Sequence, residues 1–140
     1  KKIRYANSTE ISEKCKDPVI DLMTSQKEII NKGGTMRLGA WDCEIEKNTK
    51  SYKSYKKKLI SERHRHRYEF NNSYSDKIFD DKFIVAGSNP DTKLVEIVEN
   101  IDHPWFVGVQ FHPEYKSSVY NPHPIFVNFV KASLKNYLKK

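Results

Sequence analysis

The chain has 140 residues, of which 37% are hydrophobic, so it is long enough for one domain with a hydrophobic core and too short for two to be expected. Its net charge of +7 permits nucleic-acid, anionic-membrane or nucleotide partners and proves none, because lysine-rich faces are common on soluble domains. No apolar run approaches the length of a membrane span, no secretory signal opens the chain, and the two cysteines have no disulfide spacing. We therefore expect a protein of the reducing cytoplasm without a membrane partner.

The first third of the chain predicts short elements separated by polar turns. Lys1–Tyr5 is expected to be the end of a helix, and Ala6–Glu10 is polar and turn-prone. Pro18–Thr24 is expected to form a strand. Gly33–Gly34 break the chain, after which Thr35–Cys43 is expected to form one arm of a hairpin.

A polar, lysine-rich segment, Asn48–Lys58, carries apolar residues at three- and four-residue spacing, which predicts a short helix. The next stretch, Glu62–Phe70, alternates strictly: its histidines would share one face of a strand and its three arginines the other. Neither face is apolar, so the stretch is a poor core strand, and a break of the local rule marks a candidate functional site. The arginines could hold a carboxylate or phosphate, or could form salt bridges with Glu62 or Glu69. We expect His64 and His66 to be hydrogen-bonded rather than metal-bound, because the further ligands that zinc needs have no spacing signature here.

The middle of the chain predicts one more short helix and two strands. Ser73 or Ser75 is expected to cap the helix, which would run through Phe79. Phe83–Gly87 and Leu94–Glu99 are the expected strands, with a turn of sequence SNPDT between them.

The segment Trp105–Phe111 is almost wholly apolar and predicts a strand that is buried on both faces of a sheet. The polar residues that follow it are expected at the sheet rim, because Pro113 has no N–H for a further ladder bond. His112 and Glu114 are two positions apart and would point to the same side in extended backbone. An imidazole held by a carboxylate is two-thirds of a nucleophilic catalytic triad, although a rim histidine can also simply hydrogen-bond a loop.

The C-terminal segment predicts an amphipathic helix. His123 is a candidate cap, and Pro124 suits the first helical turn. Strands that alternate with helices indicate an α/β layered domain. The helix is expected to turn one apolar stripe toward the sheet, made of Phe126, Phe129, Val130, Leu134 and Tyr137.

Neither cysteine fits the nucleophile that the pair of His112 and Glu114 would need. A nucleophile on a strand-to-helix elbow needs small neighbours, usually glycine, so that the next backbone N–H can help bind an oxyanion. Cys15 lies in EKCKD and Cys43 in WDCEI, without glycine on either side. We expect the nucleophile to lie outside this chain.

Several motifs together resemble one family. GGTMRLG (Gly33–Gly39), ERHRHRYEFN (Glu62–Asn71), LVEIVE (Leu94–Glu99) and HPWFVGVQFHPEYKS (His103–Ser117) are similar to the glutaminase domain of CTP synthase. FHPE alone indicates only a class I glutamine amidotransferase, whereas GGTMRLG with ERHRHRYE is typical of the CTP synthase branch. The resemblance runs nearly end to end, and it implies an α/β fold with a central mixed sheet flanked by helices, here incomplete.

The resemblance also implies roles for residues of this sequence. His112 and Glu114 match the histidine and glutamate of a Cys-His-Glu triad that hydrolyses glutamine. Glu10 and Arg67 match glutamine-binding positions, Arg67 for the charged end of the substrate and Glu10 for its amino group or amide. No metal ligand is implied in this chain.

In the family, ammonia passes from the glutaminase domain to an amidoligase domain, where UTP is phosphorylated by ATP with magnesium and then aminated to CTP. GTP activates glutamine hydrolysis, and Trp41 lies in a plausible neighbourhood for that effect. The resemblance implies L-glutamine and the amidoligase domain as partners and a homo-oligomer, a tetramer in the family, with no nucleic acid.

The chain departs from the family in beginning after the expected GICLGMQ elbow. We therefore expect residues 1–140 to be the C-terminal portion of a glutaminase domain, without its nucleophile elbow and amidoligase domain, and inactive alone. Three alternatives stay open: another class I amidotransferase or a peptidase of that fold, a non-catalytic glutaminase-like domain, and a basic nucleic-acid-binding module built on Glu62–Phe70.

Overall fold

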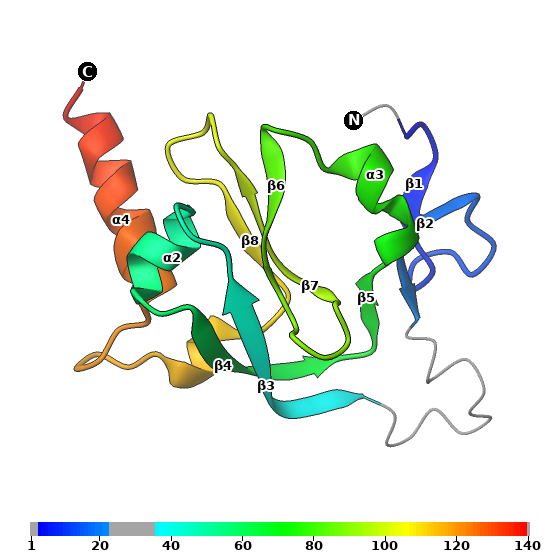
Figure 1. The fold of residues 1–140 in the computed structure, drawn as a ribbon, viewed down its shortest axis with the longest axis horizontal. Helices are drawn as coiled ribbons and strands as arrows, with labels where there is room; N and C mark the ends of the chain where they lie inside the picture. The colour runs from blue at the N-terminus through cyan, green and yellow to red at the C-terminus, as the bar shows by residue number, and fades with distance from the viewer. Residues whose placement is uncertain (1–2, 23–35, 140) are drawn as a thin grey trace.

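The computed structural model describes residues 3–22 and 36–139 (Figure 1). In these residues, a five-stranded sheet has the order β4-β3-β6-β7-β8, and a three-stranded sheet has the order β1-β2-β5. The strands are β1 (Ala6–Ser8), β2 (Asp17–Leu22), β3 (Arg37–Ile45), β4 (Leu59–His66), β5 (Tyr68–Phe70), β6 (Phe83–Ser88), β7 (Val95–Asn100) and β8 (Val107–Val109). The helices are α2 (Lys50–Tyr55), α3 (Ser75–Ile78) and α4 (Pro124–Tyr137), with 3-10 turns η1 (Asn72–Tyr74) and η2 (Pro113–Lys116).

Strands β3 and β4 form a long hairpin that makes up two of the five strands of the larger sheet. The two strands pair antiparallel over most of their length, and α2 lies between them in the sequence, as predicted for Asn48–Lys58. Thr49 caps α2 by accepting a hydrogen bond from the Tyr52 N–H, and the helix ends where Lys56 adopts a left-handed conformation. Thr49 and Lys56 thus mark where α2 begins and where it ends.

The hydrophobic core lies on one face of the larger sheet, under α2. At its centre Gly87 approaches β3 so closely that a Cβ there would lie 2.8 Å from the Cys43 Sγ. A glycine is therefore required by space rather than by backbone conformation at this point. The buried hydrophobic residues of this core are Cys43, Ile45, Ile60, Ala86, Ile97 and Phe111.

The predicted single strand Glu62–Phe70 is divided between the two sheets. Strand β4 ends at His66, and after Arg67 the chain continues as β5, which pairs antiparallel with β2. The prediction that this stretch is a poor core strand was wrong for one face, since Glu62 and His64 are 3% and 1% exposed. The alternative that the arginines of this stretch form salt bridges with Glu62 or Glu69 is not observed in the described residues. Glu62 pairs there with His123 and Lys116, and Glu69 pairs with Arg37 and His66.

The predicted central strand Trp105–Phe111 is shorter and less buried than expected. Only Val107–Val109 forms β8, which lies at one edge of the five-stranded sheet, and its three residues are half-buried. Phe106 is 45% exposed. In the described part of the chain, then, this strand has a neighbour on one side only, and burial on both faces is not observed.

The apolar stripe predicted for α4 exists, but it does not face the sheet. His123 caps the helix through the Ile125 N–H, as predicted, and Pro124 opens it. Of its helical residues only Ile125 is buried, while Val130 and Leu134 are 61% and 56% exposed. The helix instead packs against α2 (Figure 1).

The remaining predictions differ in detail. Residues 3–5 form a turn rather than a helix end. Of the stretch expected to be turn-prone, Ala6–Glu10, the first three residues form β1, which is parallel to β2, and only the last two form a turn. Pro18–Thr24 agrees with β2 as far as Leu22, and Gly33–Gly34 lie outside the described residues. The side chain of Asn71, not Ser73 or Ser75, caps the turn before α3. The strands predicted at Phe83–Gly87 and Leu94–Glu99 are confirmed as β6 and β7.

Candidate active site

His112 and Glu114 lie together at the end of the segment that follows β8. The His112 backbone N–H donates to the Arg63 carbonyl at 2.9 Å, which ties this position to β4. The His112 Nδ1 is 2.6 Å from a Glu114 carboxylate oxygen. Both side chains are accessible, with 34% and 54% of their surface exposed. The structure therefore places the imidazole and the carboxylate in contact and on the surface rather than in the core.

The contact determines which nitrogen of His112 carries the hydrogen. A carboxylate can only accept, so Nδ1 must donate and Nε2 is left as a proton acceptor. Slight burial of Glu114 opposes its ionisation, but its own backbone N–H, His112 and Arg65 more than offset this and lower its pKa. Glu114 is thus ionised at neutral pH and can stabilise an imidazolium when His112 takes a second proton.

Tyr115 and two arginines of β4 hold this pair from the side. The Arg65 guanidinium donates to the Tyr115 hydroxyl at 2.7 Å, and the Arg63 guanidinium lies over the Tyr115 ring. The centroid of the Tyr115 ring is 5.5 Å from that of the His112 ring. The Arg63 carbon lies 5.4 Å from the Tyr115 ring centroid. The exposed arginine face of β4 therefore supports the histidine segment.

A cavity of about 540 Å³ brings together the two residues predicted to bind glutamine, Glu10 and Arg67. Glu10 is exposed, and its backbone N–H donates to the Ser8 hydroxyl. The Nε of Arg67 is buried and has no hydrogen-bond partner among residues 3–22 and 36–139, so within that part of the chain it is an unsatisfied donor at this site. The other residues that line the cavity are Ile20, Met36, Arg65, His66, Tyr68 and Gln110.

Behind the cavity, five side chains from β3, β4, β5 and β7 form a closed ring of polar contacts, and all but the partly exposed His66 are buried. Arg37 lies 2.6 Å from Glu96 and 3.6 Å from Glu69. His64 is 3.5 Å from Glu96, His66 is 3.7 Å from Glu69, and the two histidines are joined by a contact of 2.7 Å. The predicted hydrogen bond between His64 and His66 is therefore present, as part of a larger network.

Burial sets the protonation of this ring. It lowers the pKa of His64 to about 3 and of His66 to about 4, with the Arg37 charge acting in the same direction, so both rings are neutral at pH 7. Burial also raises the pKa of Glu69 to about 7 and that of Glu96, against the opposing effect of Arg37. Two carboxyl groups that share one guanidinium are most stable when one of them keeps a proton, because the ring is then close to neutral.

The cysteines of the described chain do not meet His112. Cys43 is fully buried in the core, and burial raises the pKa of its thiol to about 12, so it cannot serve as a thiolate near pH 7. Cys15 is half-buried and lines a different cavity with Thr9 and Tyr68. Among residues 3–22 and 36–139, no three His, Cys, Asp or Glu side chains are grouped so that they could hold a metal ion, and no helix is long and apolar enough to cross a membrane.

Sequence reasoning missed several residues of the site. Tyr115 and Gln110 were not identified as part of the site, although both lie within the motif HPWFVGVQFHPEYKS. Arg37, a member of the buried ring, was also missed, because its neighbours in GGTMRLG gave no sign that its charge is buried. The available signal was that Arg37 is a charged residue within a segment, β3, whose other residues alternate between the two faces of a strand.

Comparison with known proteins gives three findings. The sequence profile of the family described as Glutamine amidotransferase class-I matches residues 7–132. CTP synthases of Flavobacterium johnsoniae and Christiangramia forsetii are 60% and 56% identical over 134 and 138 residues, which are 96% and 99% of this chain. The chain spans about a quarter of the length of these relatives, 25% in each.

A solved structure has a similar fold. The structure described as the Trypanosoma brucei CTPS glutaminase domain with bound acivicin superposes with a TM-score of 0.83 at 36% sequence identity, over 94% of this chain and 51% of that one. The predicted α/β fold and the resemblance drawn from the sequence motifs are thereby confirmed.

Proposed function

The chain belongs to the class-I glutamine amidotransferase family, and we propose that it is the C-terminal portion of the glutaminase domain of a CTP synthase. In this proposal the domain hydrolyses glutamine and supplies ammonia for the ATP-dependent amination of UTP to CTP. The observation that carries it is the contact of 2.6 Å between His112 Nδ1 and Glu114, at an accessible position that β4 also anchors.

The reaction would proceed through a thioester. A cysteine thiolate from outside these 140 residues attacks the amide carbon of glutamine, and the imidazolium of His112 gives its Nε2 proton to the departing ammonia. Neutral His112 then takes a proton from the water that attacks the thioester, which releases glutamate and returns the thiol. Glu114 keeps Nδ1 protonated in both steps, so Nε2 alone exchanges protons.

Arg67 and Glu10 would hold the substrate. Arg67 offers a buried donor that no other described residue engages, which suits the α-carboxylate of glutamine. Glu10 lines the same cavity and can accept from the α-amino group. A cavity of about 540 Å³ is large enough for an amino acid and its water. The side chains of His64 and His66 behind the cavity are neutral at pH 7 and so add no positive charge that would compete with Arg67 for the substrate carboxylate.

The other partners follow from the same proposal. ATP and magnesium would act in an amidoligase domain of the same protein, GTP would activate hydrolysis, and the enzyme would be a cytoplasmic homo-oligomer. Trp41 is half-buried, with the Arg37 guanidinium 4.5 Å from its ring centroid, so a GTP effect at Trp41 would reach the buried ring through Arg37.

The test compares two activities of the intact enzyme. We expect His112→Ala to reduce glutamine-dependent CTP formation by roughly 10⁴-fold and to leave the ammonia-dependent reaction unchanged, since only the first needs the imidazole. Glu114→Gln should lower the glutamine-dependent rate while keeping the shape of the site. Glu46→Gln, at an exposed glutamate away from the site, is the matched control. Equal loss of both activities in His112→Ala would mean that His112 is structural and would sink the proposal.

A further inference from the structure

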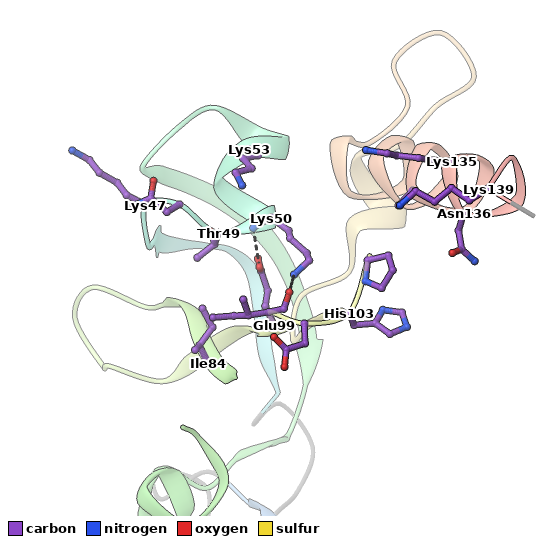
Figure 2. Close-up of a pocket in the computed structure, with 15 residues that line it drawn as sticks. Lys47, Thr49, Lys50, Lys53, Ile84, Glu99, His103, Lys135, Asn136 and Lys139 are labelled. Carbon is purple, nitrogen blue, oxygen red and sulfur yellow. Dashed lines mark hydrogen bonds between the residues drawn. The ribbon is translucent and has the colours of Figure 1, made fainter. Parts of the chain in front are cut away.

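A second cavity, of about 590 Å³, lies between α2, α4 and the loop that joins β7 to β8 (Figure 2). Lysines of both helices line it: Lys50 and Lys53 from α2, and Lys135 at the end of α4 with Lys139 just beyond it. Figure 2 shows the side chains of Lys135 and Lys139 extending toward the side of the cavity where the α2 lysines lie. Positive charge from two separate elements thus converges on one space.

Most of this positive charge has no partner within the described chain. The Lys50 amine donates to the carbonyls of Asn100 and Ile101 at 2.8 and 3.1 Å, which fixes it in place. Lys47, just before α2, also lines the cavity. Among residues 3–22 and 36–139, no carboxylate pairs with the four lining lysines other than Lys50, which are Lys47, Lys53, Lys135 and Lys139. Like charges that face one another repel, so the cavity is electrostatically suited to a polyanion.

The two acidic residues that line the cavity do not supply the missing negative charge. Glu99 is buried and accepts hydrogen bonds from the Lys50 N–H at 2.8 Å, the Ser51 N–H at 2.7 Å and the Ser51 hydroxyl at 2.6 Å, so its charge stabilises the start of α2. Asp102 forms a salt bridge of 2.9 Å with Lys82. Both carboxylates are therefore already engaged by other groups.

The rest of the lining limits the ligand class. Ile84, Pro104 and Ala132 give the cavity an apolar part beside the ammonium groups. No Phe, Tyr or Trp is among the described residues that line it, whereas single-stranded nucleic acid is held by bases stacked on such rings. Lysine binds phosphate as a point charge, and several phosphate charges can satisfy three ammonium groups at once. The size is that of a small-molecule site.

We propose that this cavity binds a small organic di- or triphosphate. The phosphate oxygens accept hydrogen bonds from Lys53, Lys135 and Lys139, and the organic part lies against Ile84 and Pro104. None of these residues takes part in the proposed glutamine chemistry, so this site and the active site can fail independently.

The test is lysine footprinting on the intact protein with inorganic triphosphate as the probe. Brief acetylation followed by peptide mass spectrometry reports each lysine separately, so other phosphate sites in the protein do not confuse the result. At a probe concentration about ten times Kd, we expect Lys53, Lys135 and Lys139 to be acetylated roughly tenfold more slowly. Lys57 and Lys131, exposed near the same two elements and not lining the cavity, should be unaffected.

A matched pair of variants checks the assignment. Lys53→Gln with Lys135→Gln should weaken triphosphate binding about tenfold or more, because two charge-assisted contacts are lost. Lys57→Gln with Lys131→Gln removes the same charge and should leave binding unchanged. If sulfate at equal ionic strength protects the three lysines equally, or if Lys57 and Lys131 are protected as well, the effect is general attraction of anions and the proposal is wrong. Protection by a short RNA but not by triphosphate would overturn the ligand class.

Discussion

Strand β4 buries polar side chains, whereas helix α4 exposes apolar ones. Glu62 and His64 of β4 are 3% and 1% exposed, while Val130 and Leu134 of α4 are 61% and 56% exposed. In β4 each buried polar side chain contacts other polar side chains: Glu62 contacts Tyr55 and His123, and His64 belongs to the ring of Arg37, Glu69, Glu96 and His66. In α4 the apolar stripe has no such cover among the described residues.

The comparison shows that an alternating or helical pattern determines which side chains share a face, while the surface opposite decides whether that face is buried. Polar groups can lie in a protein interior at little net cost when their hydrogen bonds and charges are matched. Apolar groups stay exposed when nothing is placed against them, however regular their spacing. Both faces were correctly grouped from the sequence, and it was their surroundings that the sequence left open.

The largest effect is expected from a substitution that disrupts the buried ring. Arg37→Met removes the only guanidinium in the ring and leaves two buried carboxyl groups without their cation, which should cost about 3–5 kcal/mol of unfolding free energy. Urea unfolding of the 140-residue chain, followed by circular dichroism, measures this loss. Arg63→Met, on the exposed face of the same hairpin, is the control. It loses only the contact with the exposed Tyr115 ring and should change stability by less than about 1 kcal/mol. A loss below about 1 kcal/mol for Arg37→Met would show that the ring contributes little to folding.

The stability of the buried ring should also depend on pH, through the titration of Glu69. Burial raises the pKa of Glu69 to about 7 from an ordinary value of 4.5, so between these values the folded chain holds a proton that the unfolded chain has released. The stabilising contribution of this proton is complete below pH 4.5 and is lost as the pH rises to 7. Relative to wild type, Glu69→Gln should therefore gain about 2–3 kcal/mol over this range.

Urea unfolding at a series of pH values measures this change, with Glu46→Gln as the control at an exposed carboxyl. His64 and His66 titrate in the opposite sense, since burial lowers their pKa values, but they are present in both proteins and largely cancel in the difference. A difference between Glu69→Gln and wild type that stays constant from pH 4.5 to 7 would mean that Glu69 is ionised throughout.

Local chemistry explains which parts of the structure were predictable. The cap of α4 at His123, the helix in Asn48–Lys58 and the contact between His112 and Glu114 all depend on residues a few positions apart, and the structure contains each of them. The short segment after β8 is therefore the part of the site that the sequence determined most directly.

The features that the sequence did not predict depend on residues far apart in the chain. Arg37 meets Glu96 only because β3 and β7 both pair with β6, and no local pattern contains that information. The position of β8 at a sheet edge, and the exposure of the α4 stripe, likewise depend on which surfaces lie opposite. The roles of Glu10 and Arg67 came from the family resemblance rather than from spacing, and the structure adds that they line one cavity.

The smallest expected effect lies on α4. Leu134 is 56% exposed and its neighbours in the stripe are also accessible, so Leu134→Ser removes little buried apolar area. In the 140-residue chain we expect a loss of no more than about 0.5 kcal/mol in unfolding free energy, measured by urea unfolding. Ile125→Ser, at the one buried position of the same helix, should cost several times more, because that side chain is 6% exposed. A large loss for Leu134→Ser in the 140-residue chain would mean that the stripe is covered in solution. If the loss is small there but about 2 kcal/mol or more in the intact protein, a surface outside these residues covers α4, and the difference between β4 and α4 then reflects what lies opposite each element rather than the elements themselves.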